Sequence, residues 1–351
     1  MSSFEVTGII LITFFISAFS LKFIEQPLRG IRPIIPEKKR LFSYSSIVMI
    51  IVILFGGLIY LQKGMPYRYP VASSVLLAID ETQQLPKFKE TIKILSYVDN
   101  DKIATVGNGN NQSFILWGDS HARALIPAIS ATANKTGLSG FIVCGGTRPP
   151  FLGVDIIGQN SSYLYQEGVV SFIKAHSAIK TVILAGNWER YAIGHKYMLK
   201  EDLRLKDMKE VNSFESNPAL FKIGLTRTVN TILALGRRVI IVSDVPEIGY
   251  SAPRLFWIKN IFNKNIKNLL PTIIDYHKYN NNAESLLNSL SLLHNVTILH
   301  PEKMLFDEND RLMIMANKQI LYSDADHLSR EGALFISPIF DKSFMEMANA
   351  M

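Results

Sequence analysis

The fold is decided by the stretch Phe114-Ile-Leu-Trp-Gly-Asp-Ser-His-Ala122, where a short apolar run rich in β-forming residues ends at a Gly-Asp-Ser turn. A segment of helical length follows this turn. A strand that leads directly into a helix is typical of a βαβ unit. Comparable apolar runs lie at Gly140-Phe-Ile-Val143, Thr181-Val-Ile-Leu184, Val239-Ile-Ile-Val242 and Val296-Thr-Ile-Leu299.

The segments between these runs have the length and amphipathic pattern of helices. They cover residues 122–136, 162–178, 219–235 and 283–293, and a last helix follows Ser329. This alternation predicts an α/β domain over residues 113–351, with a parallel sheet between two layers of helices. Since ligands bind at the carboxyl ends of such strands, we expect the functional site beside the Gly-Asp-Ser turn.

The first 61 residues differ from the rest because they contain two long apolar runs. Val6 to Leu21 has no charged residue, and Leu41 to Leu61 has none either. Runs of about 20 apolar residues are long enough to span a bilayer. They predict transmembrane helices over about residues 4–24 and 41–61. A cleaved signal peptide and a pair of buried core helices are the alternatives, but the first run lacks a basic start.

The loop between these runs, residues 22–40, predicts the topology because it is rich in lysine and arginine. Short basic loops stay in the cytoplasm. The N-terminus and everything after Tyr60 would then lie in the periplasm, which makes the chain a multi-pass inner-membrane protein. Residues 62–112 contain three prolines and several polar runs, so we expect a periplasmic linker with a short helix from Lys87 to Tyr97.

The overall charge and the cysteine content exclude several kinds of site. The net charge of +7 is not gathered on one face, and the densest basic stretch lies in the membrane loop, so we expect no nucleic-acid binding. Cys144 is the only cysteine, which rules out an intrachain disulfide and a four-cysteine zinc site. The seven histidines show no metal-ligand spacing, so we expect no metal.

Ser120 is the candidate nucleophile. A serine at a strand-to-helix junction presents its hydroxyl at the sheet edge, close to backbone N–H groups that can bind an oxyanion. The alternative is an ordinary turn in which Ser120 only caps the helix.

A second motif favours the catalytic interpretation. The stretch Tyr322-Ser-Asp-Ala-Asp-His-Leu-Ser329 places Asp324 three residues before His327 in a loop that precedes the last helix. One turn can then present the imidazole to the serine while Asp324 accepts its other N–H. Asp326 is not expected to reach the ring. The alternative is a solvated acidic loop with Ser329 as the helix cap.

These motifs resemble the SGNH, or GDSL-like, hydrolases, which carry Gly-Asp-Ser after the first strand and Asp-x-x-His near the C-terminus. More narrowly, they are similar to the SGNH domains fused behind acyltransferase-3 membrane domains. The matching stretches are Leu116-Trp-Gly-Asp-Ser-His-Ala122, Leu184-Ala-Gly-Asn-Trp-Glu-Arg-Tyr191, Asp324-Ala-Asp-His-Leu-Ser329 and, for the end of the membrane domain, Lys22-Phe-Ile-Glu-Gln-Pro-Leu-Arg29. The resemblance covers nearly the whole chain and implies a flavodoxin-like sheet behind two transmembrane helices.

The resemblance also implies an oxyanion hole. Its donors would be the backbone N–H of Ser120, that of Gly145 or Gly146, and the side chain of Asn187. The Gly186-Asn187 block lacks the residue that the family places between glycine and asparagine. Further candidates for substrate contact are the two neighbours of the serine, Asp119 and His121, and the aromatic residues Trp188 and Tyr191. These two rings could stack on a sugar, and the alternative is that they pack in the core or at the rim of the site.

The activity implied by the resemblance is O-acetylation of a cell-envelope glycan such as lipopolysaccharide O-antigen. In that family the membrane domain passes an acyl group, derived from acetyl-CoA, across the bilayer, and the SGNH serine delivers it to a sugar. No bound cofactor is expected. Most of the membrane domain is absent from this sequence, so we expect an acyltransferase-3 domain in cis or as a partner. A periplasmic carbohydrate esterase or deacetylase and a non-catalytic glycan-binding module are the alternatives.

Overall fold

The computed structural model describes residues 3–29, 37–62, 93–98, 101–158, 162–199, 201–209, 215–261, 265–317 and 319–350. The chain divides into two compact units, Met1–Tyr69 and Pro70–Met351.

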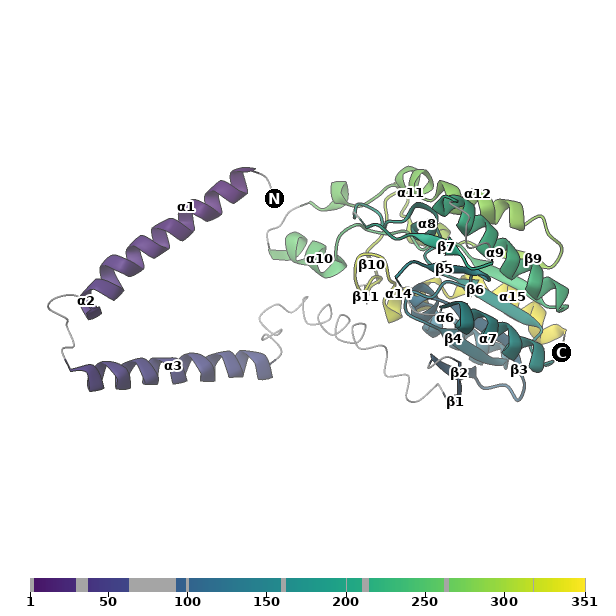
Figure 1. Cartoon of the computed structure of the whole chain (residues 1–351), viewed down its shortest axis with the longest axis horizontal. Helices are drawn as coiled ribbons and strands as arrows, with labels where there is room; N and C mark the ends of the chain where they lie inside the picture. The colour runs from purple at the N-terminus through teal and green to yellow at the C-terminus, as the bar shows by residue number, and fades with distance from the viewer. Residues whose placement is uncertain are drawn as a thin grey trace. The chain divides into compact units, whose positions relative to one another are not determined.

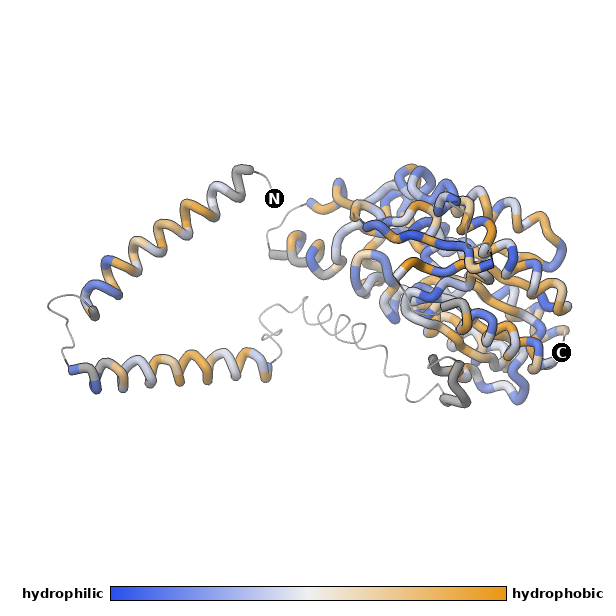
Figure 2. The backbone as a smooth tube through the Cα atoms, in the orientation of Figure 1, coloured by the Kyte–Doolittle hydropathy of each residue, from blue (hydrophilic) through white to orange (hydrophobic). Residues whose placement is uncertain are grey.

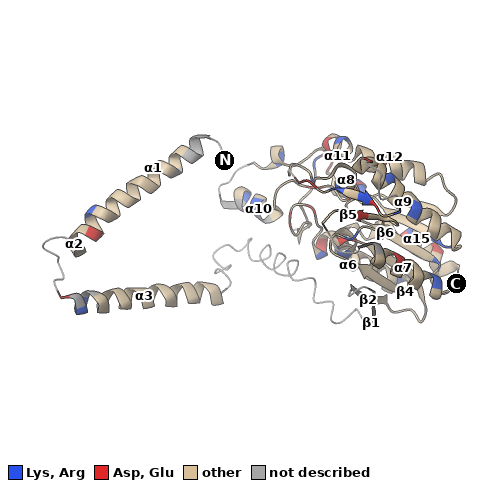
Figure 3. Cartoon of the chain, viewed as in Figure 1, with Lys and Arg blue, Asp and Glu red and all other residues tan. Residues whose placement is uncertain are grey.

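The first unit is helical. It contains α1 (Ser3–Ser20), the π-helical turn η1 (Leu21–Glu25), α2 (Gln26–Arg29) and α3 (Lys38–Leu61). Two stretches, Ile10–Leu28 and Phe42–Leu61, are long and apolar enough to cross a membrane. Their described side chains are largely exposed, and Figures 2 and 3 show mostly apolar residues along both helices with charges near the ends. Helices that are apolar on every side are typical of a lipid environment.

The second unit is built on a seven-stranded sheet with the order β1-β2-β4-β3-β6-β8-β9. Five strands, from β4 to β9 in that order, are parallel, whereas β1 and β2 are antiparallel at one edge (Figure 1). This confirms the predicted α/β fold. The strands are β1 (Lys93–Val98), β2 (Asp101–Gly107), β3 (Gln112–Gly118), β4 (Ser139–Cys144), β6 (Thr181–Ala185), β8 (Arg238–Val242) and β9 (Val296–Leu299).

Strands β1 and β2 correct the linker prediction for residues 62–112. Residues 93–97, the end of the predicted helix, form strand β1, and β2 pairs with β4 inside the sheet. The start of that helix, residues 87–92, lies outside the described residues. Strand β2 belongs to the sheet because Ile103 packs into the core on one face and Val106 into the core on the other. The domain therefore begins before residue 113.

Helices cover both faces of the sheet. Alternating residues of β3 explain the two layers: Phe114 and Leu116 pack against α6, α14 and α15, whereas Ile115 and Trp117 pack on the side of α7 and α9. The helices are α5 (Ser120–Ala124), α6 (Ile126–Thr136), α7 (Ser162–Ala175), α8 (Trp188–Ile193), α9 (Asn217–Ala234), α10 (Ala252–Ile261), α11 (Ile273–Tyr279), α12 (Asn281–Leu290), α13 (Glu302–Leu305), α14 (Arg330–Ile336) and α15 (Pro338–Asn349).

Three short elements complete the unit. They are the antiparallel pair β5 (Val154–Ile156) with β7 (Leu205–Asp207), the pair β10 (Met315–Ala316) with β11 (Gln319–Ile320), and the 3₁₀ turn η4 (Lys267–Leu269).

The position of β3 explains where a site can form. This strand lies between β4 and β6. The chain runs from β3 to β4 on one side of it and later continues with β6 on its other side. Such a reversal opens a crevice at the carboxyl end of the strand. Gly118 closes the strand there, and a Cβ at this position would overlap the carbonyl oxygen of Ala185 on β6. Only glycine lets the two strand ends approach this closely.

Candidate active site

Ser120 is the first residue of α5 and does not act as its cap. The cap is Asp119, whose carboxylate accepts the N–H of His121 at 2.8 Å. The hydroxyl of Ser120 is instead hydrogen-bonded to Nε2 of His327 at 2.8 Å. The structure therefore favours a hydroxyl that is available for chemistry over the helix-cap alternative.

A tight loop presents His327 and Asp324 together. Oδ2 of Asp324 lies 2.8 Å from Nδ1 of His327. Its Oδ1 accepts the backbone N–H groups of Asp326 at 3.0 Å and of His327 at 2.8 Å, which fixes the turn. The loop leads into α14, which Ser329 caps by accepting the N–H of Gly332 at 2.9 Å. The structure thus brings Ser120, His327 and Asp324 into one line.

The electrostatics of this line suit proton transfer. Burial opposes the ionisation of Asp324, but its hydrogen bond to His327 outweighs this and lowers the pKa of the Asp324 carboxyl. An ionised Asp324 at Nδ1 favours the tautomer with its proton on that nitrogen. Nε2 of His327 is then able to accept the proton of the Ser120 hydroxyl.

Asp119 is a structural residue and does not face a substrate. Its carboxylate is buried and accepts three hydrogen bonds, from the N–H groups of His121 (2.8 Å) and Asn187 (3.0 Å) and from the hydroxyl of Tyr191 (2.7 Å). Burial, followed by the charge of Asp119, raises the pKa of Tyr191 well above its usual value. Asp119 therefore joins the end of β3 to the start of α8.

Of the two roles expected for Trp188 and Tyr191, sugar stacking and core packing, the structure shows core packing. Both side chains are fully buried, and both contact the ring of Phe151. The indole N–H of Trp188 donates to the carbonyl of Val242 at 2.7 Å. They belong to the core because α8 turns this side of the helix toward the sheet.

Of the predicted oxyanion donors, those of Ser120, Gly145 and Asn187 are engaged within the protein. The N–H of Ser120 donates to the carbonyl of Gly146 at 2.9 Å, and that of Gly145 donates to Gly118 at 3.1 Å. The side-chain amide of Asn187 donates to Glu247 at 2.8 Å. A substrate oxyanion could use the serine N–H only after the Gly146 carbonyl has moved.

His121, also proposed for substrate contact, is buried beside the triad. Its ring centroid lies 4.6 Å from that of His327, and its Nε2 is 3.5 Å from Oδ2 of Asp326. The buried side chain of Asp326 also reaches Nδ1 of His327 at 3.5 Å, contrary to the expectation that it would not approach the ring. Lys196 pairs with the same carboxylate, its Nζ lying 2.6 Å from Oδ2.

Sequence reasoning missed the roles of Asp326, Lys196 and Glu247. Asp326 carried a weak signal, because it is a second acid directly before His327. Lys196 carried none, since it is a single lysine far from the motif. Glu247 follows β8 and accepts the backbone N–H of Tyr197 at 2.8 Å, which ties the segment after α8 to the site.

A metal ion fits this cluster poorly. Among the described residues, His121, Asp326 and His327 have ligand-type atoms within 4.8 Å of one another. However, Asp326 is already paired with the Lys196 ammonium, and Nε2 of His327 is hydrogen-bonded to Ser120. A divalent cation would have to displace Lys196 from Asp326, the one carboxylate with which it forms an ion pair among the described residues.

Three solved structures are similar to part of the chain. The periplasmic domain of the lipopolysaccharide acetyltransferase of Salmonella ser. Paratyphi A has 17% identity and a TM-score of 0.49, covering 68% of this chain and 85% of that one. A carbohydrate acetylesterase from Sinorhizobium meliloti has 14% identity and a TM-score of 0.37, with coverages of 68% and 100%. A GDSL-like lipase from Bacteroides thetaiotaomicron has 11% identity and a TM-score of 0.36, with coverages of 67% and 88%.

Comparison with curated protein sequences gives no significant match. The family pattern described as an SGNH domain fused to AT3 domains matches residues 88–342, which is most of the chain. The match includes the Gly-Asp-Ser turn, the Asp-x-x-His loop and strands β1 and β2. The chain therefore belongs to the family of SGNH domains that are fused to AT3 domains, and it is an enzyme of the acyltransferase or ester-hydrolase type.

Proposed function

We propose that this chain is a membrane-anchored O-acyltransferase, which transfers an acetyl group through Ser120 to a hydroxyl of a cell-envelope glycan such as lipopolysaccharide O-antigen. The observation that carries the proposal is the hydrogen-bonded line from Asp324 through His327 to Ser120, with both links at 2.8 Å. This geometry is that of nucleophilic acyl transfer. The fusion of the family to AT3 domains supports transfer, since such a domain would supply the acyl group.

In the first half-reaction, Ser120 Oγ attacks the carbonyl carbon of the acyl donor while Nε2 of His327 takes the hydroxyl proton. The tetrahedral intermediate then collapses, and the leaving group departs with that proton. Acetyl-Ser120 remains. Asp324 contributes by holding the Nδ1 proton and by stabilising the imidazolium between the two steps.

In the second half-reaction, a sugar hydroxyl attacks the acetyl carbonyl and gives its proton to His327. The bond to Ser120 Oγ breaks, and His327 returns the proton to that oxygen. Water in place of the sugar would complete a hydrolysis with the same residues. Transfer therefore requires that the acceptor exclude water from the serine.

Oxyanion stabilisation in this scheme requires a local rearrangement. The N–H of Ser120 becomes a donor when the carbonyl of Gly146 turns away from it. Gly146 is exposed, and a Cβ built there would meet nothing within 4 Å, so the peptide that follows it has room to turn. Asn187 would serve as a second donor on release from Glu247.

The two apolar helices of the first unit fit an inner-membrane anchor, with the second unit in the periplasm. The basic loop of residues 22–40 supports this orientation. The acyl donor would be derived from acetyl-CoA and delivered by an AT3 membrane domain, either in cis or as a partner. No bound cofactor takes part.

The chemistry is tested with the full chain in bacterial membranes and an aryl acetate as donor. We expect Ser120→Ala to lower the turnover by about 10³-fold or more, because the nucleophile is lost. Ser291→Ala, a change at an exposed serine, is the matched control and should leave turnover unchanged. Equal turnover in Ser120→Ala and the unmodified chain would refute the triad.

Transfer is tested by mass spectrometry of the envelope glycan from cells with and without the gene. We expect O-acetyl groups to be lost in the deletion, restored by the unmodified chain, and not restored by Ser120→Ala. A gain of O-acetyl in the deletion would instead establish an esterase. Unchanged glycan together with an intact serine reaction would contradict this acceptor class.

A further inference from the structure

The carboxylate of Asp326 is the centre of a second, buried set of charges beside the triad. Only 3% of this residue is exposed. Its Oδ2 lies 2.6 Å from Nζ of Lys196 and 3.5 Å from Nε2 of His121, and its Oδ1 lies 3.5 Å from Nδ1 of His327. Oδ2 makes no aligned hydrogen bond among the described residues, so these interactions are mainly ionic.

The groups in this cluster favour one another's charged forms. Burial opposes protonation of His121, yet Asp326 and the nearby negative charges of Asp119 and Glu247 raise its pKa to about 9. Burial also opposes the charge of Asp326, but His121, His327 and Lys196 lower the pKa of Asp326. At neutral pH the site therefore contains two cations, His121 and Lys196, around one buried carboxylate. Removal of Asp326 alone would leave both cations without this carboxylate.

The cluster joins three segments that are far apart in the sequence. His121 lies on α5, directly after Ser120. Asp326 lies in the loop that carries Asp324 and His327. Lys196, of whose side chain 19% is exposed, lies in the segment after α8. The cluster therefore connects the segment that carries the Ser120 hydroxyl to the loop that carries the His327 imidazole.

Asp324, the partner of His327 expected from the sequence, is poorly placed to hold the imidazole alone. Half of the Asp324 side chain is exposed, so water competes for its hydrogen bond with His327. Asp326 contacts the same nitrogen from the buried side, and the ring of His121 lies against that of His327. Buried contacts restrict a side chain more than solvent-exposed ones do.

The segment that supplies Lys196 is itself held in an unusual backbone conformation. Met198 has a φ of 57°, in the left-handed region, and 61% of the residue is exposed. Such a conformation costs free energy and persists only where surrounding contacts enforce it. The contacts that hold the segment include the pair of Lys196 with Asp326, the hydrogen bond from Tyr197 N–H to Glu247 at 2.8 Å and that from the Tyr279 hydroxyl to the His195 carbonyl at 2.9 Å.

We propose that Lys196, Asp326 and His121 form a positioning network, which holds the imidazole of His327 against Ser120 during acyl transfer. This inference rests on the proposed function. None of the three needs to touch the substrate, since they act through the orientation of His327. An imidazole displaced by about 1 Å costs on the order of 10²-fold in rate, so the network controls kcat more than KM.

The central test is the double variant Lys196→Met/Asp326→Asn in the full chain. It removes Lys196 and its carboxylate partner together, and His121, which then lies beside a neutral amide, loses one of the charges that raise its pKa and can lose its proton. We expect kcat for an aryl acetate to fall by about 10- to 100-fold with little change in KM. Phosphonylation of Ser120 by a fluorophosphonate should slow in parallel, because that reaction needs the same base and no acceptor. The single variant Lys196→Arg keeps the cation and should retain most of the kcat of the unmodified chain.

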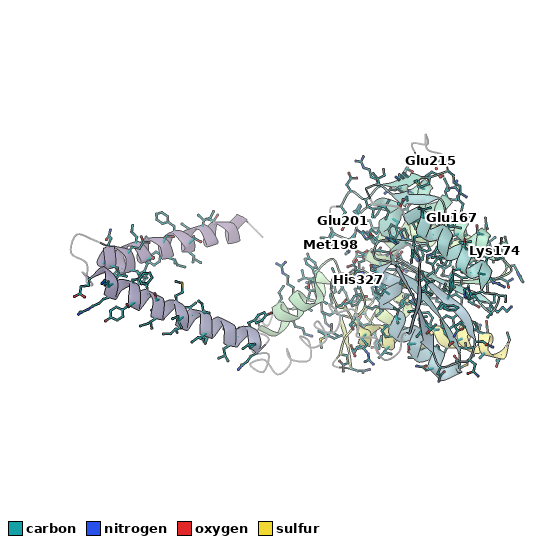
Figure 4. All side chains as sticks on the ribbon, turned by 60° about the horizontal axis from the view of Figure 1, so that its bottom comes forward. Glu167, Lys174, Met198, Glu201, Glu215 and His327 are labelled. Atoms are coloured by element: carbon teal, nitrogen blue, oxygen red, sulfur yellow. The ribbon has the colours of Figure 1, made fainter. Side chains whose placement is uncertain are left out.

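The matched control is Lys174→Met, at an exposed lysine on α7 that lies well apart from His327 (Figure 4). Tryptophan fluorescence checks that each variant is folded. Unchanged kcat and phosphonylation in the double variant, with Ser120→Ala inactive, would overturn the network and leave the proposed function intact. Activity that persists in Ser120→Ala would overturn the proposed function itself. A kcat in Lys196→Arg as low as that of the double variant would also refute the role of the lysine charge.

Discussion

Raising the pH from 6 to 9.5 should destabilise the second unit through a single buried histidine. The pKa of His121 is 6.5 in an unfolded chain and about 9 in the fold. Below pH 6.5 the residue is protonated in both states, and its stabilising contribution is complete. As the pH rises, the unfolded chain loses this proton first, so the contribution declines and is lost once the pH passes the folded value.

The size of the effect follows from the two pKa values. The interval from 6.5 to about 9 corresponds to roughly 3 kcal/mol of unfolding free energy, at about 1.4 kcal/mol for each pH unit. His121 is 6% exposed, so solvent screening reduces this little. A loss of that size lowers the urea midpoint by about 1 to 3 M for an m value of about 1 to 3 kcal/mol/M.

The assay is urea unfolding of the full chain in a mild detergent, followed by tryptophan fluorescence at several pH values. All three tryptophans, Trp117, Trp188 and Trp257, belong to the second unit, so the helices of the first unit contribute no tryptophan signal. His121→Gln is the test variant. His294→Gln, at an exposed position before β9, is the matched control.

Buried carboxyl groups also weaken the fold as the pH rises, because burial raises the pKa values of Asp244 and Glu247. The measurement that isolates His121 is therefore the difference between the unmodified chain and His121→Gln at each pH. This difference should shrink between pH 6.5 and 9. If the difference in unfolding free energy between the unmodified chain and His121→Gln stays constant with pH, His121 is not a buried cation in the fold. The same conclusion follows if the difference for His294→Gln shrinks equally.

Two further changes test other features of the site. Gly146→Ala should leave the urea midpoint unchanged, because a Cβ there meets nothing within 4 Å. It should lower kcat several-fold, because it restricts the backbone movement that turns the Gly146 carbonyl away from the Ser120 N–H. An unchanged kcat would contradict the need for this movement. Gly118→Ala should destabilise the fold by about 1 to 3 kcal/mol, since its Cβ overlaps the Ala185 carbonyl at the end of β6, and urea unfolding beside Gly146→Ala as control measures this.

The parallel part of the sheet could be predicted because its strands are short runs of β-branched and aromatic residues separated by segments of helical length. Strands β1 and β2 could not. Their apolar residues, such as Ile103 and Val106, stand between polar runs that look like a linker. Strand β2 forms because it pairs with β4 and packs on both faces of the sheet, and β1 pairs in turn with β2; these contacts are invisible to local sequence patterns.

The candidate site divides in the same way. Asp324 and His327 share one turn, so their relation follows from spacing. The partners of Asp326 come from distant segments, and no local pattern connects Lys196 to it. The sequence leaves Trp188 and Tyr191 open to either sugar stacking or core packing, because the direction in which α8 turns its side chains depends on tertiary packing.

The serine and the histidine that meet in the site are 207 residues apart in the chain. At a synthesis rate of about 5 to 20 residues per second, roughly 10 to 40 s elapse between the incorporation of one and of the other. A nascent chain that is stalled or cleaved before His327 carries the hydroxyl without its base. The complete line of serine, histidine and aspartate therefore forms only after His327 has been synthesised, and a shorter copy lacks the base.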